Sequence, residues 1–293
     1  MLGAIEAGGT KFVCAVGDKD LNVIKRISFP TSTPEETLEK AFGLFDSYED
    51  LEAIGIGSFG PIDINRDSST YGYITSTPKP NWKNFDFIGK MKNHYDMPLG
   101  WTTDVNASCL GEYELGSAAD NNSCLYLTVG TGIGGGGIID GNFIECLGHP
   151  EMGHILINPH PQDNFKGWCP YHGKCLEGLA AGPSIEKRYG LRAEALEKDH
   201  EIWKILAYYL GQAMVNYTLV LRPEKIILGG GVMKQPHMLG LVQEEFTRLM
   251  GGYVESPPVE TYIVSPSLGD NAGIIGGLML AKKELKNKEG KNE

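Results

Sequence analysis

The sequence lacks the features of exported and membrane-bound proteins. No apolar run approaches the roughly 18 residues that a membrane-spanning helix requires. The first residues, Met1 to Glu6, contain no basic side chain, and their apolar stretch is too short for a signal peptide. We therefore expect a cytoplasmic protein. The chain has only six cysteines, and in a reducing compartment these favour buried thiols or metal ligands over disulfides.

Positive charge is also scarce. The chain has 26 Lys and Arg residues against 37 Asp and Glu residues, which gives a formal net charge of −11 at pH 7. Nucleic acids and anionic membranes are polyanions, so this balance argues against either as the main partner. A small anion is still compatible with it, because backbone N–H groups and a metal ion bind such a ligand locally.

The length and the order of the expected elements predict two lobes. A chain of 293 residues exceeds the usual size of one domain. In both halves a strand runs into a glycine loop, a second strand and a turn, at residues 2–20 and again at 124–141. We expect a duplicated α/β fold with a smaller lobe at 1–118 and a larger one at 119–271, facing each other across a cleft. A helix at about 272–286 is expected to pack back on the first lobe.

The first glycine loop is Glu6-Ala-Gly-Gly-Thr-Lys11. Its glycines allow the backbone to approach a phosphate closely, while Thr10 offers a hydroxyl and Lys11 a charge. A simple hairpin turn explains the motif equally well. The absence of Gly-Lys-Ser/Thr before a helix excludes a Walker loop, and the β-rich sequence after the motif argues against a Rossmann loop.

The second glycine loop, Gly130 to Gly137, has six glycines in eight residues. So many glycines carry a large entropic cost, which favours a loop that meets a ligand over an idle flexible one. Thr131 has a hydroxyl suited to a β- or γ-phosphate. A third cluster, Gly229-Gly230-Gly231, comes after an expected strand at 225–228 and suits the close approach of a nucleoside, although alone it is a weak signal.

Asp104 stands where an expected strand at 99–103 meets an expected helix at 106–116. One interpretation is that Asp104 or Asn106 merely caps the helix, and spacing alone favours this interpretation. The functional interpretation is a general base, a carboxylate that takes the proton of a substrate hydroxyl as the hydroxyl attacks a phosphoryl group.

A metal pattern lies in the loop-rich stretch from residue 143 to residue 182. Two cysteines and two histidines, in a Cys-x2-His-x2-Cys motif with a histidine upstream, supply the four N/S ligands of a closed tetrahedral site: His154, Cys169, His172 and Cys175. The alternative is two unrelated thiols and two surface histidines. The other cysteines are expected in core or neutral positions: Cys14, Cys109, Cys124 and Cys146. Glu151 and Glu177 flank the motif and suit hydrogen bonds from sugar hydroxyls, though each alone is more often a surface charge.

Together these motifs resemble the ROK family (repressors, open reading frames and kinases) of the actin-like ATPase superfamily. The resemblance covers essentially the whole chain. It rests on five segments: Glu6-Ala-Gly-Gly-Thr-Lys11, Asp104-Val-Asn-Ala107, Gly130-Thr-Gly-Ile-Gly-Gly135, Glu151-Met-Gly-His154 and Cys169-Pro-Tyr-His-Gly-Lys-Cys-Leu-Glu177. Within the family, the last segment is most similar to the bacterial zinc-containing fructokinases.

The resemblance implies a duplicated actin-like (ribonuclease H-like) ATPase fold and transfer of the ATP γ-phosphoryl group to fructose, giving fructose 6-phosphate. It implies ATP and Mg²⁺ as cofactors, a structural Zn²⁺ and a homodimer. Asp104 matches the general base. Sugar binding falls to Asn106, Glu151, His154 and Glu177, and the zinc ligands are His154, Cys169, His172 and Cys175. Nucleotide binding falls to Gly9, Thr10, Lys11, Thr131, Gly132, Pro183, Gly229, Gly230 and Gly231.

Two departures from the family pattern bear on function. Many members have Asp where Glu6 stands, which leaves the part of Glu6 in Mg²⁺ organisation open. Many glucose-phosphorylating members have Asn where Thr103 stands, which favours fructose here. The alternatives are another hexose (glucose, mannose or N-acetylmannosamine), a sugar-responsive repressor, and a chaperone- or filament-type ATPase. With the first glycine loop at Gly8, we expect no room for the N-terminal helix-turn-helix of a repressor.

Overall fold

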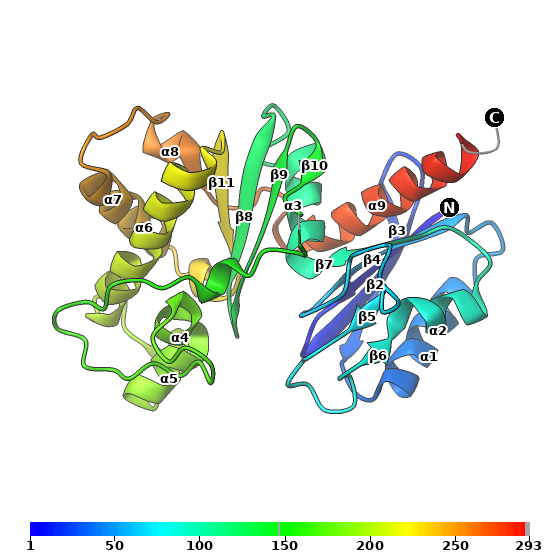
Figure 1. Ribbon diagram of the computed structural model, residues 1–293, viewed down its shortest axis with the longest axis horizontal. Coiled ribbons are helices and arrows are strands. Elements are labelled where there is room, and N and C mark those ends of the chain that lie inside the picture. Colours follow the sequence, from blue (N-terminus) through cyan, green and yellow to red (C-terminus); the bar gives the residue numbers. More distant parts are fainter. Residues whose placement is uncertain (146, 291–293) are drawn as a thin grey trace. The chain divides into compact units, whose positions relative to one another are not determined.

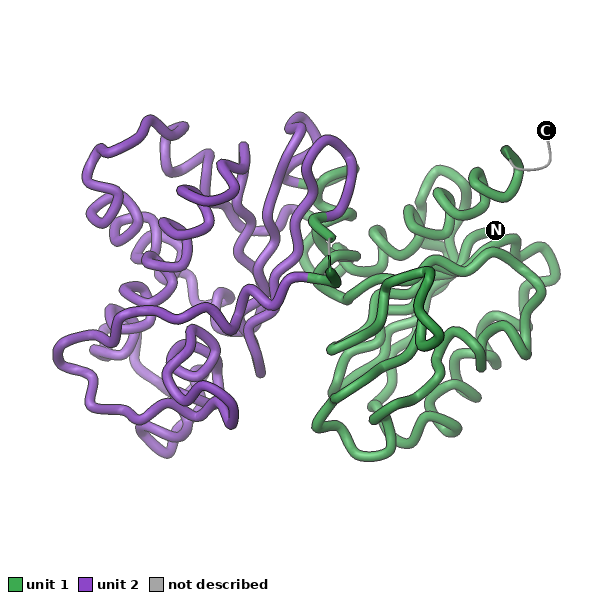
Figure 2. Tube along the Cα trace, in the orientation of Figure 1, with its two compact units in different colours: residues 1–116, 144–149, 268–293 green, residues 117–143, 150–267 purple. Residues whose placement is uncertain are grey.

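The computed structural model describes residues 1–145 and 147–290, so Cys146 lies outside the described residues. The chain divides into two compact units (Figure 2). Unit 1 comprises residues 1–116, 144–149 and 268–293, and unit 2 comprises residues 117–143 and 150–267. Unit 1 thus includes a short segment at 144–149 that the sequence-based division placed in the second lobe.

Unit 1 is built on a five-stranded mixed sheet in the order β3-β2-β1-β4-β7. The first three strands form an antiparallel meander, and β4 and β7 then extend the sheet in parallel with β1. The strands are β1 (Leu2–Ala7), β2 (Lys11–Gly17), β3 (Val23–Pro30), β4 (Ala53–Ser58) and β7 (Leu99–Thr103). Two short strands, β5 (Tyr73–Ile74) and β6 (Phe85–Asp86), pair separately.

Helices cover both faces of this sheet, because its central strands are apolar on both sides (Figure 1). Leu2 and Ala4 pack with Ile274 and Leu278 of the C-terminal helix α9 (Ala272–Glu289). The alternate residues of β1 face a second core that includes Leu38. That core also contains residues of α1 (Pro34–Phe45) and α2 (Phe87–His94).

Helix α3 (Asp104–Leu115) begins directly after β7 and packs closely against β4. The contact is so tight at Gly57 that an added Cβ would lie 2.6 Å from the Cβ of Ala107. Helix α9 lies along α3 in the same unit. Close packing of this kind fixes the first turn of α3 at the carboxyl ends of the parallel strands.

Unit 2 repeats the strand order and strand directions of unit 1. Its sheet has the order β10-β9-β8-β11-β12, again an antiparallel meander extended by two parallel strands. The strands are β8 (Ser123–Val129), β9 (Ile133–Ile139), β10 (Asn142–Phe143), β11 (Lys225–Gly229) and β12 (Ile263–Val264). The predicted internal duplication of the α/β fold is therefore confirmed at the level of strand order.

The α-helices of unit 2 lie between β10 and β12 in the sequence. They are α4 (Leu176–Ala180), α5 (Gly182–Tyr189), α6 (Ile202–Leu221), α7 (Met238–Met250) and α8 (Val259–Tyr262). Single 3₁₀ turns are η1 (Met152–His154), η2 (Ala193–Ala195), η3 (Val232–Lys234) and, in unit 1, η4 (Gly269–Asn271). Within residues 1–145 and 147–290, no helix is both long enough and apolar enough to cross a membrane.

The expected loop at Gly130–Gly137 is wrong in its extent. Only residues 130–132 form the turn, and the later glycines belong to strand β9. The reason is packing, since η1 lies against this strand. An added Cβ at Gly135 would lie 2.7 Å from the sulfur of Met152. Some of these glycines are therefore present because a neighbouring element packs against the strand, and not because the loop is flexible.

Candidate functional site

The first glycine turn, between β1 and β2 in unit 1, presents backbone N–H groups. Its carbonyl oxygens accept hydrogen bonds from within the unit: Gly8 from the Thr31 hydroxyl at 2.7 Å, Thr10 from the Thr31 N–H at 3.0 Å, and Gly9 from the Lys79 ammonium group. In the part of the chain that the structure describes, the N–H groups of Gly9 and Thr10 have no acceptor. Backbone N–H groups left without an acceptor are suited to an anion.

Glu6 precedes this turn on β1. Burial raises the pKa of its carboxyl group, and the positive charges of Lys11 and Arg26 offset only part of that rise. An added Cβ at Gly273 of α9 would lie 2.8 Å from the carboxyl carbon of Glu6. A carboxylate held in a buried position gains from a nearby cation.

Asp104 is the first residue of α3, at the carboxyl end of β7. The helix cap is its neighbour Thr103, whose hydroxyl oxygen accepts the N–H of Asn106 at 3.1 Å. Oδ1 of Asp104 accepts the N–H of Val105 at 2.9 Å. The interpretation of Asp104 or Asn106 as a mere cap is therefore wrong, because Thr103 performs that function.

Asn106 is fully buried and holds a carboxylate from a distant segment. Its Nδ2 donates to Oγ1 of Thr102 at 3.0 Å and to Oε1 of Glu145 at 3.1 Å. Its Oδ1 is buried without a hydrogen bond among the residues that the structure describes. Sequence reasoning missed this contact of Glu145, because no local motif marks it. Burial raises the pKa of Glu145, and the charge of His149 and the hydrogen bonds from Thr102 and Asn106 offset only part of that rise.

In unit 2, three segments of the predicted nucleotide site meet. The Gly130 carbonyl accepts the N–H of Gly182 at 2.8 Å, so the start of α5, with Pro183 as its next residue, lies against the second glycine turn. Gly230 has a φ of +92°, and an added Cβ there would lie 2.5 Å from the backbone of Val129. Thr131 is exposed at the tip of this turn, next to Gly132.

The four predicted metal ligands also come together in unit 2. Their ligand atoms all lie within 4.8 Å of one another: His154, Cys169, His172 and Cys175. Nδ1 of His154 lies 3.7 Å from the sulfur of Cys169 and 3.5 Å from that of Cys175. Nδ1 of His172 lies 3.8 Å from the sulfur of Cys169. These separations match the roughly 3.3–3.8 Å edges of a tetrahedron with metal–nitrogen and metal–sulfur bonds of about 2.0 and 2.3 Å.

The chemistry of this donor set suits a divalent metal. Burial raises the pKa of the Cys175 thiol to about 11, and the neighbouring Cys169 adds to the rise. A raised pKa keeps the Cys175 thiol protonated until a cation arrives. Metal binding would therefore release protons and stabilise the segment that carries the ligands.

Glu177 links the metal cluster to the second glycine turn. Its Oε2 accepts the N–H of Ile133, the first residue of β9, at 2.9 Å. Its Oε1 lies 3.9 Å from Nε2 of His154. Glu151 precedes η1, and its carbonyl oxygen accepts the N–H of His154 at 3.0 Å. The predicted sugar-binding residues of unit 2 thus share one neighbourhood with the metal cluster.

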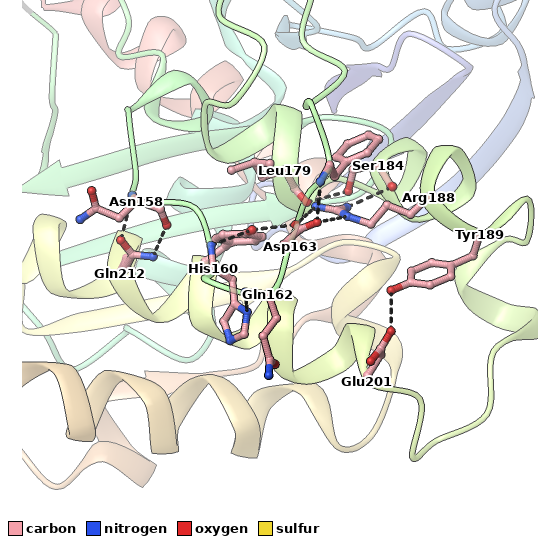
Figure 3. A network of polar contacts seen from close by, with 12 residues as sticks. Asn158, His160, Gln162, Asp163, Leu179, Ser184, Arg188, Tyr189, Glu201 and Gln212 are labelled. Carbon is pink, nitrogen blue, oxygen red and sulfur yellow. Dashed lines mark hydrogen bonds and ion pairs between the residues drawn. The ribbon is translucent and has the colours of Figure 1, made fainter.

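A buried ion pair anchors the segment between η1 and the first cysteine of the cluster (Figure 3). Arg188 of α5 donates to Oδ2 of Asp163 at 2.7 Å, and the two side chains are only 5% and 6% exposed. The Tyr209 hydroxyl of α6 donates to the same oxygen at 2.7 Å. Burial alone would raise the pKa of Asp163, but the hydrogen bonds from Arg188 and Tyr209 hold it below its usual range. The network ties the segment between η1 and Cys169 to α5 and α6.

Comparisons with known proteins agree with this organisation. A model of the ROK family matches residues 2–284. The chain is 51% identical to a putative fructokinase of Bacillus subtilis over 97% of this chain and 96% of that protein. It is also 51% identical to a fructokinase of Streptococcus mutans, over 97% and 98% of the two chains. The crystal structure of a ROK hexokinase from Thermus thermophilus superposes with a TM-score of 0.80 at 27% identity, covering 98% of this chain and 99% of that one.

The class defined by these findings is an α/β protein with the duplicated actin-like ATPase fold, as the sequence predicted. The chain belongs to the ROK family.

Proposed function

We propose that this protein is a fructokinase, which transfers the γ-phosphoryl group of ATP to the 6-hydroxyl of fructose and releases ADP. The observation that carries the choice of sugar is the identity of 42–51% to relatives named as fructokinases, over nearly the full length of both chains. Relatives named as glucokinases are only 26–27% identical. The geometry within each unit supports the individual roles.

Asp104 is assigned as the general base. It stands at the carboxyl ends of parallel strands, where open α/β sheets commonly bind their ligands. The sugar hydroxyl attacks the γ-phosphorus, the bond between that phosphorus and the bridging oxygen breaks, and Asp104 accepts the hydroxyl proton. The capping hydrogen bond of α3 is made by Thr103 and not by Asp104.

The two glycine turns are assigned to the nucleotide. In unit 1, the N–H groups of Gly9 and Thr10, with Lys11 at the start of β2, would bind phosphate oxygens. In unit 2, the phosphate contacts are Thr131 and Gly132, while Pro183 and the turn of Gly229, Gly230 and Gly231 border the nucleoside. The convergence of these segments around Gly130 supports the second assignment.

Magnesium is assigned to the nucleotide, and Glu6 is the residue of unit 1 that we expect to help hold it. The buried carboxylate of Glu6, with its raised pKa, would gain from a divalent cation. When bound, Mg²⁺ neutralises phosphate charge during transfer.

Zinc is the metal that the four-residue cluster fits best. Two sulfur and two nitrogen donors at tetrahedral separations are a structural zinc set, and four protein ligands leave no position for a reactive water. When bound, zinc supplies rigidity to the segment between Glu151 and Glu177. The backbone of this segment then sets the positions of the Glu151 and Glu177 carboxylates.

Sugar binding is assigned to Glu151, His154 and Glu177. The contacts of His154 divide between its two nitrogens: Nδ1 faces both thiols, and Nε2 lies 3.9 Å from Glu177. A metal on Nδ1 would fix the proton on Nε2, which then donates a hydrogen bond. Asn106 is buried and its amide nitrogen is already used, so we assign it to holding Glu145 in unit 1.

A coupled ADP-release assay over fructose, glucose, mannose and N-acetylmannosamine tests the proposal. We expect kcat/KM to be highest for fructose, and phosphorus NMR of the product to show a phosphate ester at O6. A preference for another hexose would change the proposed substrate but leave the proposed kinase activity in place. ATP hydrolysis that no sugar stimulates would overturn the proposal and favour another type of actin-like ATPase.

The assembly and location are proposed on the same family grounds. We expect a homodimer, and light scattering coupled to size-exclusion chromatography measures it directly. A mass of one chain, 31.9 kDa, at micromolar concentration would contradict this expectation. We also expect a cytoplasmic location, which cell fractionation tests.

A further inference from the structure

Lys79 is a cation held against the first glycine turn. It lies 70 residues away from that turn in sequence, yet its ammonium group donates to the carbonyl oxygen of Gly9, within unit 1. An ammonium group has three donors, and in the part of the chain that the structure describes Gly9 is its one hydrogen-bond acceptor. Lys79 therefore places a positive charge at the same turn whose Gly9 and Thr10 N–H groups have no acceptor among the described residues.

The segment that carries Lys79 has a restricted backbone. Pro78 and Pro80 flank the lysine and restrict the backbone on both sides. The backbone N–H of Lys79 donates to Oγ1 of Thr77, at 3.3 Å, and that threonine is itself buried. The proline-flanked lysine is thus held in place and is not a mobile surface charge.

A buried tryptophan anchors the end of this segment. Trp82 is fully buried, and its ring N–H donates to the carbonyl oxygen of Ser32 at 2.8 Å. It packs on Phe12, the second residue of β2, with ring centroids 5.5 Å apart. Asn84 then closes the segment with a hydrogen bond to the carbonyl of Thr75 at 3.0 Å. The same strand, β2, that starts at the glycine turn thus supports the segment that carries Lys79.

We propose that Lys79 is a catalytic residue that binds the transferring phosphoryl group and stabilises its charge. The inference rests on the proposed kinase function. In the reaction the oxygen–phosphorus bond to the sugar forms as the bond to ADP breaks, and negative charge spreads over the phosphoryl oxygens. A cation fixed beforehand at this position strengthens its interaction with the phosphoryl group in the transition state without reorganising. Lys79 keeps its proton throughout, since Asp104 takes the proton of the hydroxyl.

Three substitutions separate charge from structural support. Lys79→Gln keeps a donor for the Gly9 carbonyl and removes the charge. Lys79→Met removes both, and Lys79→Arg keeps the charge with a different donor geometry. Lys83→Gln is the matched control, because Lys83 is an exposed lysine of the same segment. Each variant is compared with wild type by circular dichroism and thermal midpoint, so that a folding defect is recognised.

We expect kcat to fall about 10²–10³-fold in both Lys79→Gln and Lys79→Met, the loss typical of removing one transition-state donor. Lys79→Arg should recover part of this loss, and Lys83→Gln should match wild type. If Lys79→Gln keeps wild-type kcat, the lysine only supports the Gly9 carbonyl and the inference is wrong. A rise in the KM for sugar with unchanged kcat would also overturn it, because it would make Lys79 a sugar ligand.

A binding measurement distinguishes failure of this inference from failure of the proposed function. Calorimetry without any sugar gives the affinities for a non-hydrolysable ATP analogue and for ADP. We expect Lys79→Gln to bind the ATP analogue about tenfold more weakly while its affinity for ADP stays within twofold of wild type. Equal losses for both nucleotides, or no loss for either, would overturn the role of Lys79, whether or not a sugar is phosphorylated.

Discussion

The two units have the same strand order and differ in the segments that support their glycine turns. In each, an antiparallel meander with a glycine turn is extended by two parallel strands. Unit 1 supports its turn with a proline-flanked lysine anchored by a buried tryptophan. Unit 2 supports its turn with a carboxylate, Glu177, that also approaches His154 of the four-residue Cys/His cluster.

The difference shows which parts of a duplicated fold are repeated and which parts differ between the two units. The sheet needs only apolar strands and close helix packing, so both units build it alike. The chemistry sits in the segments outside the sheet, and these have no counterparts in the two units. Asp104 belongs to unit 1, whereas the metal cluster belongs to unit 2. Substitutions in each unit should therefore have different consequences.

The largest effect is expected at Asp104. Asp104→Asn should lower kcat about 10²–10⁴-fold, because an amide cannot accept the hydroxyl proton. Calorimetric affinity for ADP should stay near that of wild type. The matched control is Asp86→Asn, since Asp86 also begins a helix of unit 1, as the cap of α2. A near-normal kcat in Asp104→Asn would show that Asp104 is not the general base.

The next effect concerns the ion pair of unit 2. Asp163→Asn leaves Arg188 buried without its counter-ion, which typically costs about 3–5 kcal/mol. The thermal midpoint should fall sharply, whereas Glu245→Gln, which breaks an exposed pair with Arg248, should change it little. A midpoint close to that of wild type for Asp163→Asn would show that the network does not anchor the segment.

The same pair predicts a dependence on acidity. The pKa of Asp163 is lower in the folded protein than its ordinary value of 3.8. Its contribution to stability is therefore present above about pH 4 and is lost as the pH falls through the lower, folded value. Asp163→Asn should flatten that part of the stability profile. An unchanged acid limb in thermal melts would contradict the assignment.

Removal of the metal should affect unit 2 alone. With a zinc chelator, or in Cys175→Ser, we expect faster hydrogen exchange in residues 155–175 and a rise in the KM for fructose. Exchange in β1 and β2 of unit 1 should stay the same. Cys14→Ala is the control, because Cys14 is a buried thiol outside the cluster. Elemental analysis that finds no zinc in active, folded protein would refute the metal assignment itself.

The smallest effect is expected at Glu6, and it has opposite signs for stability and activity. Burial raises the pKa of Glu6 above 4.5, so the favourable contribution of its protonated form is lost as the pH rises through the folded value. Glu6→Gln should therefore have a higher thermal midpoint than wild type at pH 7, and this gain should vanish below about pH 4.5. Activity should require more Mg²⁺. A lower midpoint at pH 7 with unchanged Mg²⁺ dependence would contradict both expectations.

Much of the site could be predicted because its parts are local. The Cys-x2-His-x2-Cys spacing places three ligands within one short segment, and the strand–helix junction at Asp104 arises from the chain itself. The glycine content of residues 130–137 was a more ambiguous signal. A glycine that frees a loop and a glycine that admits a neighbouring element look the same in sequence, and Gly135 proved to be the second kind.

The sequence by itself determined the duplicated order of strands, the two glycine turns and the membership of the four-residue Cys/His cluster, because these depend on periodicity and short spacings. Only the tertiary structure decided that Thr103 caps α3, that Asn106 holds Glu145, and that Lys79 reaches Gly9. The latter two are contacts between segments far apart in the chain. Their partners are selected by how the segments pack, and no local pattern records that choice.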